Sequence, residues 1–302
     1  MTVPAPWFPW ISHLLRTALA VAMLLPPGLR ADDLERIREA GVLRHLGVPY
    51  ANFVTGAGDG LDVELMRGFA EHLGVRYEFV QTDWRHAFGD LTGRHVRRSD
   101  EGVEYLEDTA IRGDVLANGV TILPWREEVV DFSEPTFPTA VWLVARADSS
   151  LQPIEPTGSL PGDIRVVKGS LDGRSVLGLT NTCLDPGLYR MDETGAEMRL
   201  LPKLRQLNEM VPAILNRDAE ATLLDVPDAL IALERWPGEI KIIGPISEEQ
   251  AMGVAFRKDS DGLRQAFNRY YAQLRETGAY QAQVRHYYPA VFRYYAEFFD
   301  SN

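Results

Sequence analysis

The sequence of 302 residues contains a single cysteine and few histidines, and these absences exclude several classes of protein. With only Cys183 present, no intramolecular disulfide can form. None of the histidines beyond residue 31 has a carboxylate or cysteine partner at metal-binding spacing. A glycine-rich phosphate loop and a Gly-x-Ser-x-Gly motif are also missing. We therefore expect no metal, no cofactor, and a Cys183 thiol that is packed or lines a pocket rather than acting as a nucleophile.

Positive charge is scarce, which argues against a nucleic-acid partner. The formal net charge is −12, and residues 1–31 carry two arginines and no acid, so the remaining chain has a charge of −14. Binding to phosphate backbones requires clustered Lys and Arg side chains that release counterions. The adjacent Arg97 and Arg98 stand alone and are followed by acidic residues.

Long hydrophobic runs are missing as well. The run from Thr17 to Leu25 follows Arg16 and is shorter than the ~18 apolar residues of a membrane span. Two prolines and a glycine follow this run, and Ala31 offers a cleavage position. This pattern predicts a signal peptide over residues 1–31 and hence a periplasmic protein. An untargeted N-terminal extension is the alternative.

What the sequence does contain is an alternation of strand and helix patterns. The spacing of apolar residues predicts a strand over 42–48, a helix over 61–73 and a strand over 75–80, which together make a parallel βαβ unit. A segment rich in Pro, Gly and Ser over 149–162 indicates a boundary. The alternation then resumes with strands over 176–179, 221–224 and 240–243 and helices over 206–215, 228–235 and 263–276.

Two α/β halves in one chain predict two lobes with a cleft between them, because open α/β sheets bind ligands where the loops converge at the strand ends. Residues 84–91 contain the start of a further helix, and a strand is expected at 114–117. Residues 92–112, between them, are polar, charged and without a clear period. We expect this segment to be an insertion that forms a surface excursion.

The most informative segment is Gly113 to Pro135, with the sequence GDVLANGVTILPWREEVVDFSEP. An arginine at 126, five residues after Thr121 and between two strands, is well placed to bind a carboxylate. Its guanidinium offers two parallel donors that match two oxygens, and a hydroxyl supplies a third. Alternatively, Arg126 is a structural arginine paired with Glu127 or Glu128.

This segment resembles the signature of the periplasmic type-2 solute-binding proteins of the amino-acid-binding kind, the bacterial extracellular solute-binding proteins of family 3. In that family the pattern is roughly Gly-x-x-Asp, a small polar cluster, x-x-Arg, then Val-Asp-Phe-Ser-x-Pro. Further similar segments lie, in the family's order, at 50–64, 175–183, 220–225 and 272–288.

The resemblance implies an α/β fold of two lobes, each a βαβ-based sheet flanked by helices, joined by a two-strand hinge. Lobe 1 would comprise residues 32–140 and 250–302, with the insertion near 92–112, and lobe 2 residues 145–246. The chain would cross between the lobes near 139–146 and 245–252.

The resemblance also implies a ligand pocket in the cleft. Arg126 would pair with a ligand carboxylate, helped by Thr121 and by the backbone N–H of Thr182. Asp225 would accept a hydrogen bond from an α-ammonium group. The remaining implied ligand-binding residues are two aromatic residues that flank the ligand and an amide: Tyr50, Trp84 and Asn118.

Several positions depart from the family pattern. Gly119 and Leu123 replace hydroxyl residues, and Asn181 and Cys183 stand where Gly and Thr are usual. Asp225 could also be the N-cap of the helix at 228, a role that does not exclude ligand contact.

On function, the resemblance implies a monomeric, non-catalytic binding protein. It would close around a small polar solute, an amino acid or related carboxylate, and deliver it to the permease of an ABC transporter. Two alternatives stay open: an enzyme on the same scaffold, similar to cyclohexadienyl dehydratases, with Asp185 and Glu64 as the extra acids, or an accessory receptor for signalling. The aromatic residues after 286 are expected to pack against lobe 1, or to form a docking patch.

Overall fold

The computed structural model describes residues 1, 33–99, 101–202 and 206–300. The chain divides into two units, Met1–Ala31 and Asp32–Asn302, and the sheets and helices belong to the second. The expected signal peptide falls almost entirely outside the described residues. In the described part of the chain, no helix has the length and apolar character needed to span a membrane.

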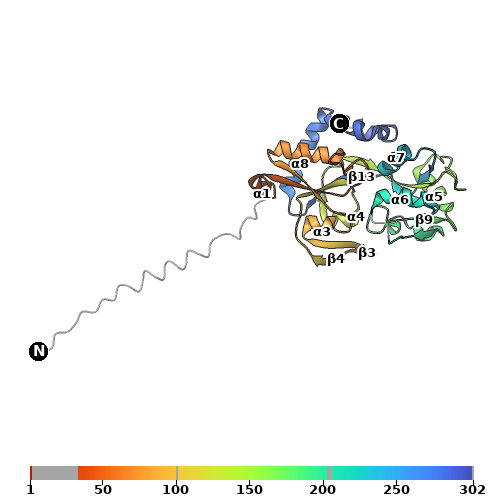
Figure 1. Ribbon diagram of the computed structural model, residues 1–302, viewed down its shortest axis with the longest axis horizontal. Helices are drawn as coiled ribbons and strands as arrows, with labels where there is room; N and C mark the ends of the chain where they lie inside the picture. The colour runs from red at the N-terminus through yellow and green to blue at the C-terminus, as the bar shows by residue number, and fades with distance from the viewer. Residues whose placement is uncertain (2–32, 100, 203–205, 301–302) are drawn as a thin grey trace. The chain divides into compact units, whose positions relative to one another are not determined.

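The fold is built on two sheets, which define the two lobes (Figure 1). Lobe 1 contains the six-stranded sheet in the order β2-β1-β5-β13-β6, with β7 also paired to β13. Its strands are β1 (Val42–Gly47), β2 (Arg76–Gln81), β5 (Val115–Thr121), β6 (Val130–Phe132), β7 (Phe137–Thr139) and β13 (Gln250–Arg257). β1 runs parallel to β2 and β5, as the βαβ pattern predicts, whereas β13 runs antiparallel to β5, β6 and β7.

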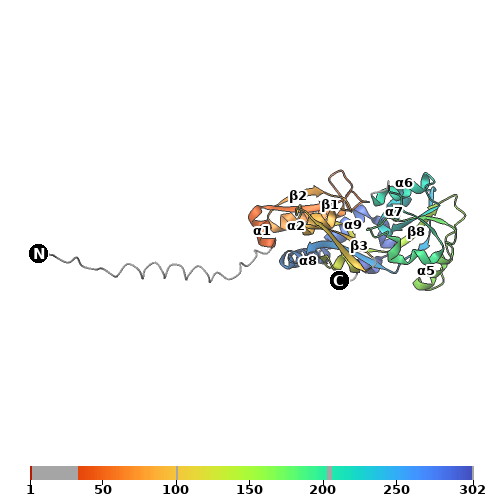
Figure 2. The same cartoon turned by 90° about the horizontal axis from the view of Figure 1, so that it is seen from below.

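Lobe 2 contains the five-stranded sheet in the order β10-β9-β11-β8-β12. Its strands are β8 (Val141–Arg146), β9 (Ser175–Leu177), β10 (Glu197–Arg199), β11 (Ala221–Asp225) and β12 (Ile240–Pro245). The chain passes from the first sheet to the second between β7 and β8, and returns between β12 and β13. Figure 2 shows the elements of the two lobes side by side. The α/β fold with two lobes is thus confirmed.

Helices cover the sheets through apolar faces with helical spacing. In α2 (Leu61–Leu73), the residues Leu65, Met66 and Phe69 are buried, and Gly74 ends the helix in a left-handed conformation. The other helices of lobe 1 are α1 (Asp33–Ala40), α3 (Ala87–Thr92), α4 (Pro124–Glu127) and α8 (Asp261–Glu276). α3 begins three residues later than the sequence predicts.

Lobe 2 carries α5 (Leu160–Gly169), α6 (Met210–Leu215) and α7 (Val226–Arg235), together with the short 3-10 helices η1 (Pro186–Tyr189), η2 (Met191–Thr194) and η3 (Leu207–Glu209). The expected boundary over 149–162 lies inside this lobe. Its residue Ile154 donates a backbone hydrogen bond to Ile243 of β12, at 2.9 Å, so the segment runs along the sheet instead of separating two domains.

The segment 92–112 is an ordered hairpin. β3 (Arg94–Ser99) and β4 (Gly102–Asp108) pair antiparallel as a separate two-stranded sheet, labelled at the lower side of the folded part in Figure 1. The expected surface excursion has the form of this largely exposed hairpin, and its residue Arg98 also contacts Asp185 of lobe 2. The segment has no hydrophobic period because both faces of its two strands are largely polar.

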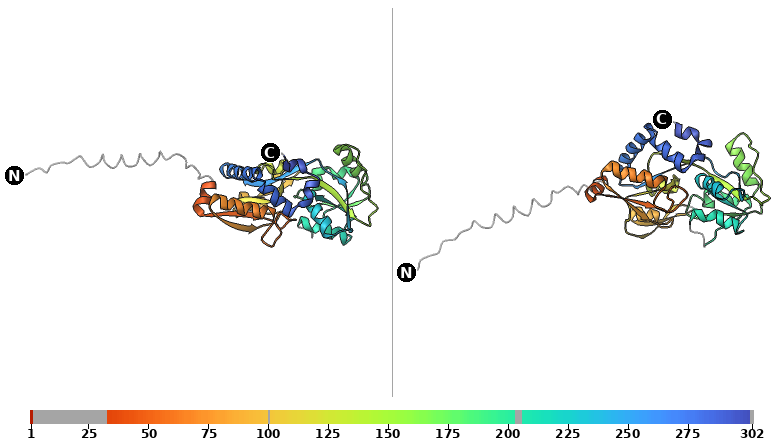
Figure 3. Two further views of the ribbon diagram at one scale, coloured as in Figure 1. Left: turned by 90° about the horizontal axis from the view of Figure 1, so that it is seen from above. Right: turned by 45° about the horizontal axis from the view of Figure 1, so that its top comes forward.

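The C-terminal aromatic residues pack against lobe 1, as expected, and extend beyond it. They belong to α9 (Ala279–Tyr287), η4 (Pro289–Arg293) and α10 (Ala296–Asp300), shown in blue in Figure 3. The ring of Tyr288 lies 5.0 Å from those of Phe53 and Phe137 in lobe 1. Tyr294 reaches β8 of lobe 2, where its ring centroid lies 5.5 Å from that of Trp142.

Candidate functional site

Arg126 is the centre of the candidate site. It lies on α4 and is only 1% exposed. Its Nη1 donates a hydrogen bond to the carbonyl oxygen of Thr121 at 2.8 Å, while Nε and Nη2 have no partner among the described residues. The guanidinium carbon lies 5.3–5.7 Å from the ring centroids of Trp84, Phe88 and Trp125. Burial lowers the pKa of Arg126, as expected for a cation held away from water.

The alternative pairing of Arg126 with its neighbours in the chain is not found. Within the described residues, Arg126 forms no ion pair with Glu127 or Glu128, which are both exposed. A fully buried guanidinium with two free nitrogen atoms is costly unless a partner arrives, because each unpaired buried donor costs ~1–3 kcal/mol.

Lobe 2 presents Asp225 to this arginine. Asp225 ends β11 and caps α7, with its Oδ1 accepting from the backbone N–H of Asp228 at 3.3 Å. Its Oδ2 lies 3.4 Å from the donating Sγ of Cys183. Burial raises the pKa of Asp225, and the nearby charge of Arg126 opposes that shift. Asp225 is therefore the N-cap of α7, and its carboxylate also faces lobe 1.

Tyr50 and Trp84 form the aromatic side of the site. Their rings meet edge to face at 6.3 Å. The Tyr50 hydroxyl lies beside Asp225 without a hydrogen bond of good geometry, and burial together with that carboxylate raises the pKa of Tyr50 well above its usual value. The indole N–H of Trp84 is also buried without a partner in the described chain.

Strand β5 contributes further unpaired polar groups. Asn118 is 0% exposed, and neither its Oδ1 nor its Nδ2 has a partner among the described residues. The hydroxyl of Thr121 is also buried without a hydrogen-bond partner among the described residues. Gln250, at the start of β13, has a buried unpaired Oε1. Because buried polar groups are nearly always hydrogen-bonded in folded proteins, such a concentration of unpaired groups is typical of a ligand site.

Thr182 differs from the other predicted residues, because its side chain stabilises its own turn. The hydroxyl donates to the carbonyl of Leu179 at 2.7 Å and accepts from the N–H of Leu184 at 3.0 Å. Only its backbone N–H lacks a partner in the described chain. The preceding residue, Asn181, adopts a left-handed φ of 61°, which explains why Asn can stand where Gly is usual.

Two residues outside the predicted set, Cys183 and Tyr189, also lie at the site. Cys183 is buried beside Asp225, and burial raises the pKa of its thiol well above the usual value. Tyr189, on η1, donates from its hydroxyl to the Cys183 carbonyl at 2.5 Å. The position of Cys183 next to Thr182 in the sequence could have indicated that Cys183 lies at the site. Tyr189 lies in an irregular segment, and nothing in the sequence indicated its position.

Gly119 has a structural reason to replace a hydroxyl residue. Its φ is +63°, and its N–H donates to Asp62 Oδ2 at 2.7 Å. A Cβ at this position would lie 2.6 Å from atoms of the Phe53 ring. The irregularity in β5 between Asn118 and Thr121 therefore requires glycine.

The two acids considered for an enzymatic role have structural partners. Asp185 Oδ1 caps η1 by accepting from the N–H of Gly187 at 3.0 Å and lies 3.4 Å from Arg98 Nη1. Glu64 accepts from the hydroxyl of Tyr287 at 2.5 Å. In the described part of the chain there is no group of three or more His, Cys, Asp or Glu side chains arranged to hold a metal ion.

Comparison with known families decides the class. The family model described as bacterial extracellular solute-binding proteins, family 3, matches residues 103–290, more than half of the chain. The chain belongs to this family. The resemblance noted in the sequence is therefore confirmed.

Curated relatives of this solute-binding protein include a binding protein and a transglycosylase. It is 26% identical over 289 residues to the L-cystine-binding protein TcyJ of Escherichia coli (strain K12), covering 90% of this chain and 95% of the relative. It is also 28% identical over 234 residues to the membrane-bound lytic murein transglycosylase F of Desulfosudis oleivorans, covering 77% of this chain. That match spans only 44% of the transglycosylase, so the chain corresponds to less than half of that relative.

Solved structures support the fold of this solute-binding protein. A crystal structure of a mutant of ArgBP from T. maritima superimposes with a TM-score of 0.66 at 22% sequence identity. The match covers 85% of this chain and 99% of the ArgBP chain. At this identity the similarity establishes the two-lobed fold.

Proposed function

We propose that this protein captures an amino acid or a related carboxylate in the periplasm and delivers it to an ABC transporter. The observation that carries the proposal is the buried Arg126 guanidinium, with Nε and Nη2 free, facing the buried Asp225 carboxylate of the other lobe. An amino-acid zwitterion supplies one partner for each of these charges. The relative in Escherichia coli is named for binding L-cystine, which has such zwitterionic ends.

In this proposal each predicted residue has one role. Arg126 pairs with the ligand carboxylate, which also accepts hydrogen bonds from Thr121 and from the backbone N–H of Thr182. Asp225 accepts from the α-ammonium group. The ligand is flanked by aromatic rings and an amide, contributed by Tyr50, Trp84 and Asn118.

Ligand binding in this proposal favours the closed arrangement, because the two anchoring charges belong to different lobes. Residues 32–140 and 250–302 move as lobe 1 against residues 145–246 as lobe 2. The protein is a monomer, is exported by a signal peptide over residues 1–31, and catalyses no reaction. The structural partners of Asp185 and Glu64 support the last point, since neither acid is free at the site.

Isothermal titration calorimetry with a panel of amino acids, organic acids and sugars tests the proposal. We expect one or more amino acids to bind, and Arg126→Gln to weaken that binding at least a hundredfold while circular dichroism stays unchanged. Arg97→Gln is the matched control, because Arg97 is an exposed arginine paired with Glu104 on the hairpin. Binding of sugars alone, or undiminished binding by Arg126→Gln, would refute the proposal. Mass spectrometry of the bound ligand after incubation would reveal any turnover.

A further inference from the structure

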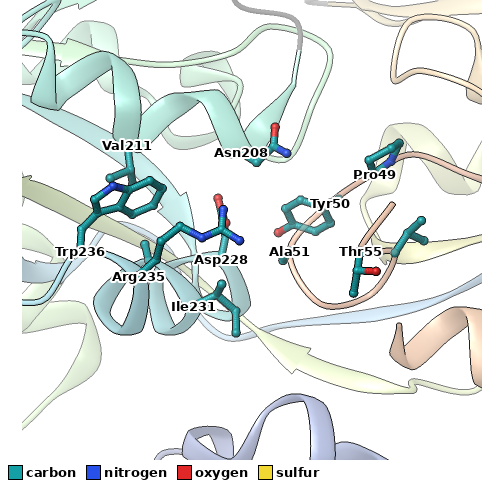
Figure 4. A pocket seen from close by; sticks show the side chains of 12 residues that line it. Pro49, Tyr50, Ala51, Thr55, Asn208, Val211, Asp228, Ile231, Arg235 and Trp236 are labelled. Carbon is teal, nitrogen blue, oxygen red and sulfur yellow. The ribbon is translucent and has the colours of Figure 1, made fainter. Parts of the chain in front are cut away.

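A pocket lies between the lobes, next to the candidate site (Figure 4). Its volume is about 140 Å³, and ~10–15 Å³ suffices for one water, so it can hold several non-hydrogen atoms of a ligand. Residues 49–55 of lobe 1 form one wall, and residues of η3, α6 and α7 form the other. Tyr50 belongs both to this wall and to the candidate site.

The pocket contains a buried acid. Asp228 is 7% exposed, and no group among the described residues donates a hydrogen bond to its carboxylate. Its backbone N–H donates to Asp225 Oδ1 at 3.3 Å, so the two acidic residues lie together at the N-terminus of α7. Burial, followed by the charge of Asp225, raises the pKa of Asp228 well above its usual value. A cationic group beside Asp228 would favour its charged form.

The same pocket contains a cationic side chain. Arg235 lies seven residues after Asp228, two helical turns along one face of α7. Figure 4 shows its guanidinium pointing toward the Asp228 carboxylate, and its charge lowers the pKa of that acid. Arg235 is exposed and forms no ion pair within 4.0 Å in the described chain, and its guanidinium carbon lies 5.5 Å from the centroid of the Trp236 ring. The donor fork of Arg235 is therefore available to a carboxylate.

The pocket thus repeats the arrangement of the candidate site, with one acid and one arginine. We propose that it binds the far end of a ligand that carries a second ammonium and a second carboxylate, with Asp228 accepting from the ammonium and Arg235 pairing with the carboxylate. The Tyr50 ring, shared by both sites, would contact the chain that connects the two ends. The ligand class is that of the diamino dicarboxylic acids. This inference rests on the proposed function and narrows its substrate.

A set of ligands that differ only at the far end tests the inference by calorimetry. 2,6-Diaminopimelate carries both far groups, L-lysine only the ammonium, L-2-aminopimelate only the carboxylate, and L-norleucine neither. We expect 2,6-diaminopimelate to bind at least tenfold more tightly than the next ligand, at a stoichiometry of one. L-Cystine should likewise bind more tightly than S-methyl-L-cysteine.

Two conservative variants assign the groups. Arg235→Gln should weaken the binding of 2,6-diaminopimelate and L-2-aminopimelate about tenfold and leave the binding of L-lysine unchanged. Asp228→Asn, which keeps the backbone N–H bonded to Asp225, should weaken the binding of 2,6-diaminopimelate and L-lysine and leave that of L-2-aminopimelate unchanged. Arg190→Gln is the control, because Arg190 is an exposed arginine of lobe 2 paired with Glu193.

The outcomes separate this inference from the proposed function. Equal affinity for the four ligands, with Arg126→Gln still abolishing binding, would refute the role of Asp228 and Arg235 in binding the far end of the ligand. It would leave the proposed function standing. A stoichiometry of two for L-norleucine or L-lysine would also refute it, because the pocket would then be an independent site. Absence of binding by every amino acid tested would overturn both.

Discussion

Arg98 and Asp185 connect the two lobes: Arg98 Nη1 of the hairpin lies 3.4 Å from Asp185 Oδ1 of lobe 2. The backbone N–H of Arg98 also donates to Asn181 Oδ1 at 3.1 Å. Asn181 and Asp185 bound the turn that contains Thr182 and Cys183, since the N–H of Asn181 donates to Asp185 Oδ2 at 3.1 Å. The hairpin therefore contacts the part of lobe 2 that faces the candidate site.

Removing this contact should favour the open arrangement. We expect Arg98→Ala to increase the dissociation rate of a bound amino acid about fivefold, because a partly buried charged hydrogen bond contributes about 1 kcal/mol. Stopped-flow fluorescence of the tryptophans at the site measures this rate. Arg97→Ala removes an exposed pair within the same hairpin and should leave the rate unchanged. Equal rates for Arg98→Ala and the wild type would show that the pair does not stabilise closure.

Asp62 should make the stability depend on pH. Burial raises its pKa to about 7, opposed by the hydrogen bond from Gly119, whereas an unfolded Asp has a pKa of about 3.9. Between about pH 4 and pH 7 the folded state holds a proton that the unfolded state has released, so its free energy of unfolding falls as pH rises. Asp62→Asn, which keeps an acceptor for Gly119, should not show this fall.

Urea denaturation at pH 4 to 8 measures the effect. The stability of Asp62→Asn relative to wild type should increase with pH and level off above about pH 7. The exposed Asp192→Asn is the control and should follow the wild type. A constant difference between Asp62→Asn and wild type over this range would contradict the prediction.

Gly119→Ala should destabilise the protein by ~1–3 kcal/mol, because the left-handed φ and the 2.6 Å approach of a Cβ to the Phe53 ring are both unfavourable. Gly169→Ala is a matched control at the end of α5, where a Cβ has no neighbour within 4 Å. Its effect should stay within about 1 kcal/mol. Chemical denaturation measures the stability of both variants, and similar stabilities would show that β5 tolerates a side chain at position 119.

Cys183 should react slowly with thiol reagents in the folded protein. Burial raises the pKa of the thiol, and the neighbouring Asp225 adds to this shift, so little thiolate is present at pH 8. We expect labelling by a disulfide reagent to be at least a hundredfold slower than in urea, and to accelerate in Arg98→Ala if opening exposes the cleft. Rapid labelling of the native wild type would contradict this environment.

The sequence predicted the parts of the fold that depend on local pattern. The helix over 61–73 and the strands around 42–47 and 76–81 follow from hydrophobic period and from glycine stops, and they appear with nearly the expected bounds. The hairpin over 94–108 could not be predicted from period, because its exposed strands gain their structure from pairing with each other and from contact with lobe 2.

Part of the candidate site could be predicted from the sequence. Arg126, Thr121 and Asp225 stand in motifs that a sequence can display, and their side chains are buried near one another in the structure. The structure also assigns the Thr182 hydroxyl to its own turn, and brings Cys183 and Tyr189 beside the site. These placements depend on turns and on the approach of two lobes, for which no periodicity exists.

By itself, the sequence determined the family and the α/β class, because motif order and hydrophobic period are carried along the chain. It also supplied the arginine, since a guanidinium can be recognised by its position between two strands. Only the tertiary structure decided that this arginine is fully buried with two free nitrogen atoms, and that a second acid and arginine lie in the adjoining pocket. Burial and pairing are properties of segments distant in sequence, and they exist only after the two lobes meet.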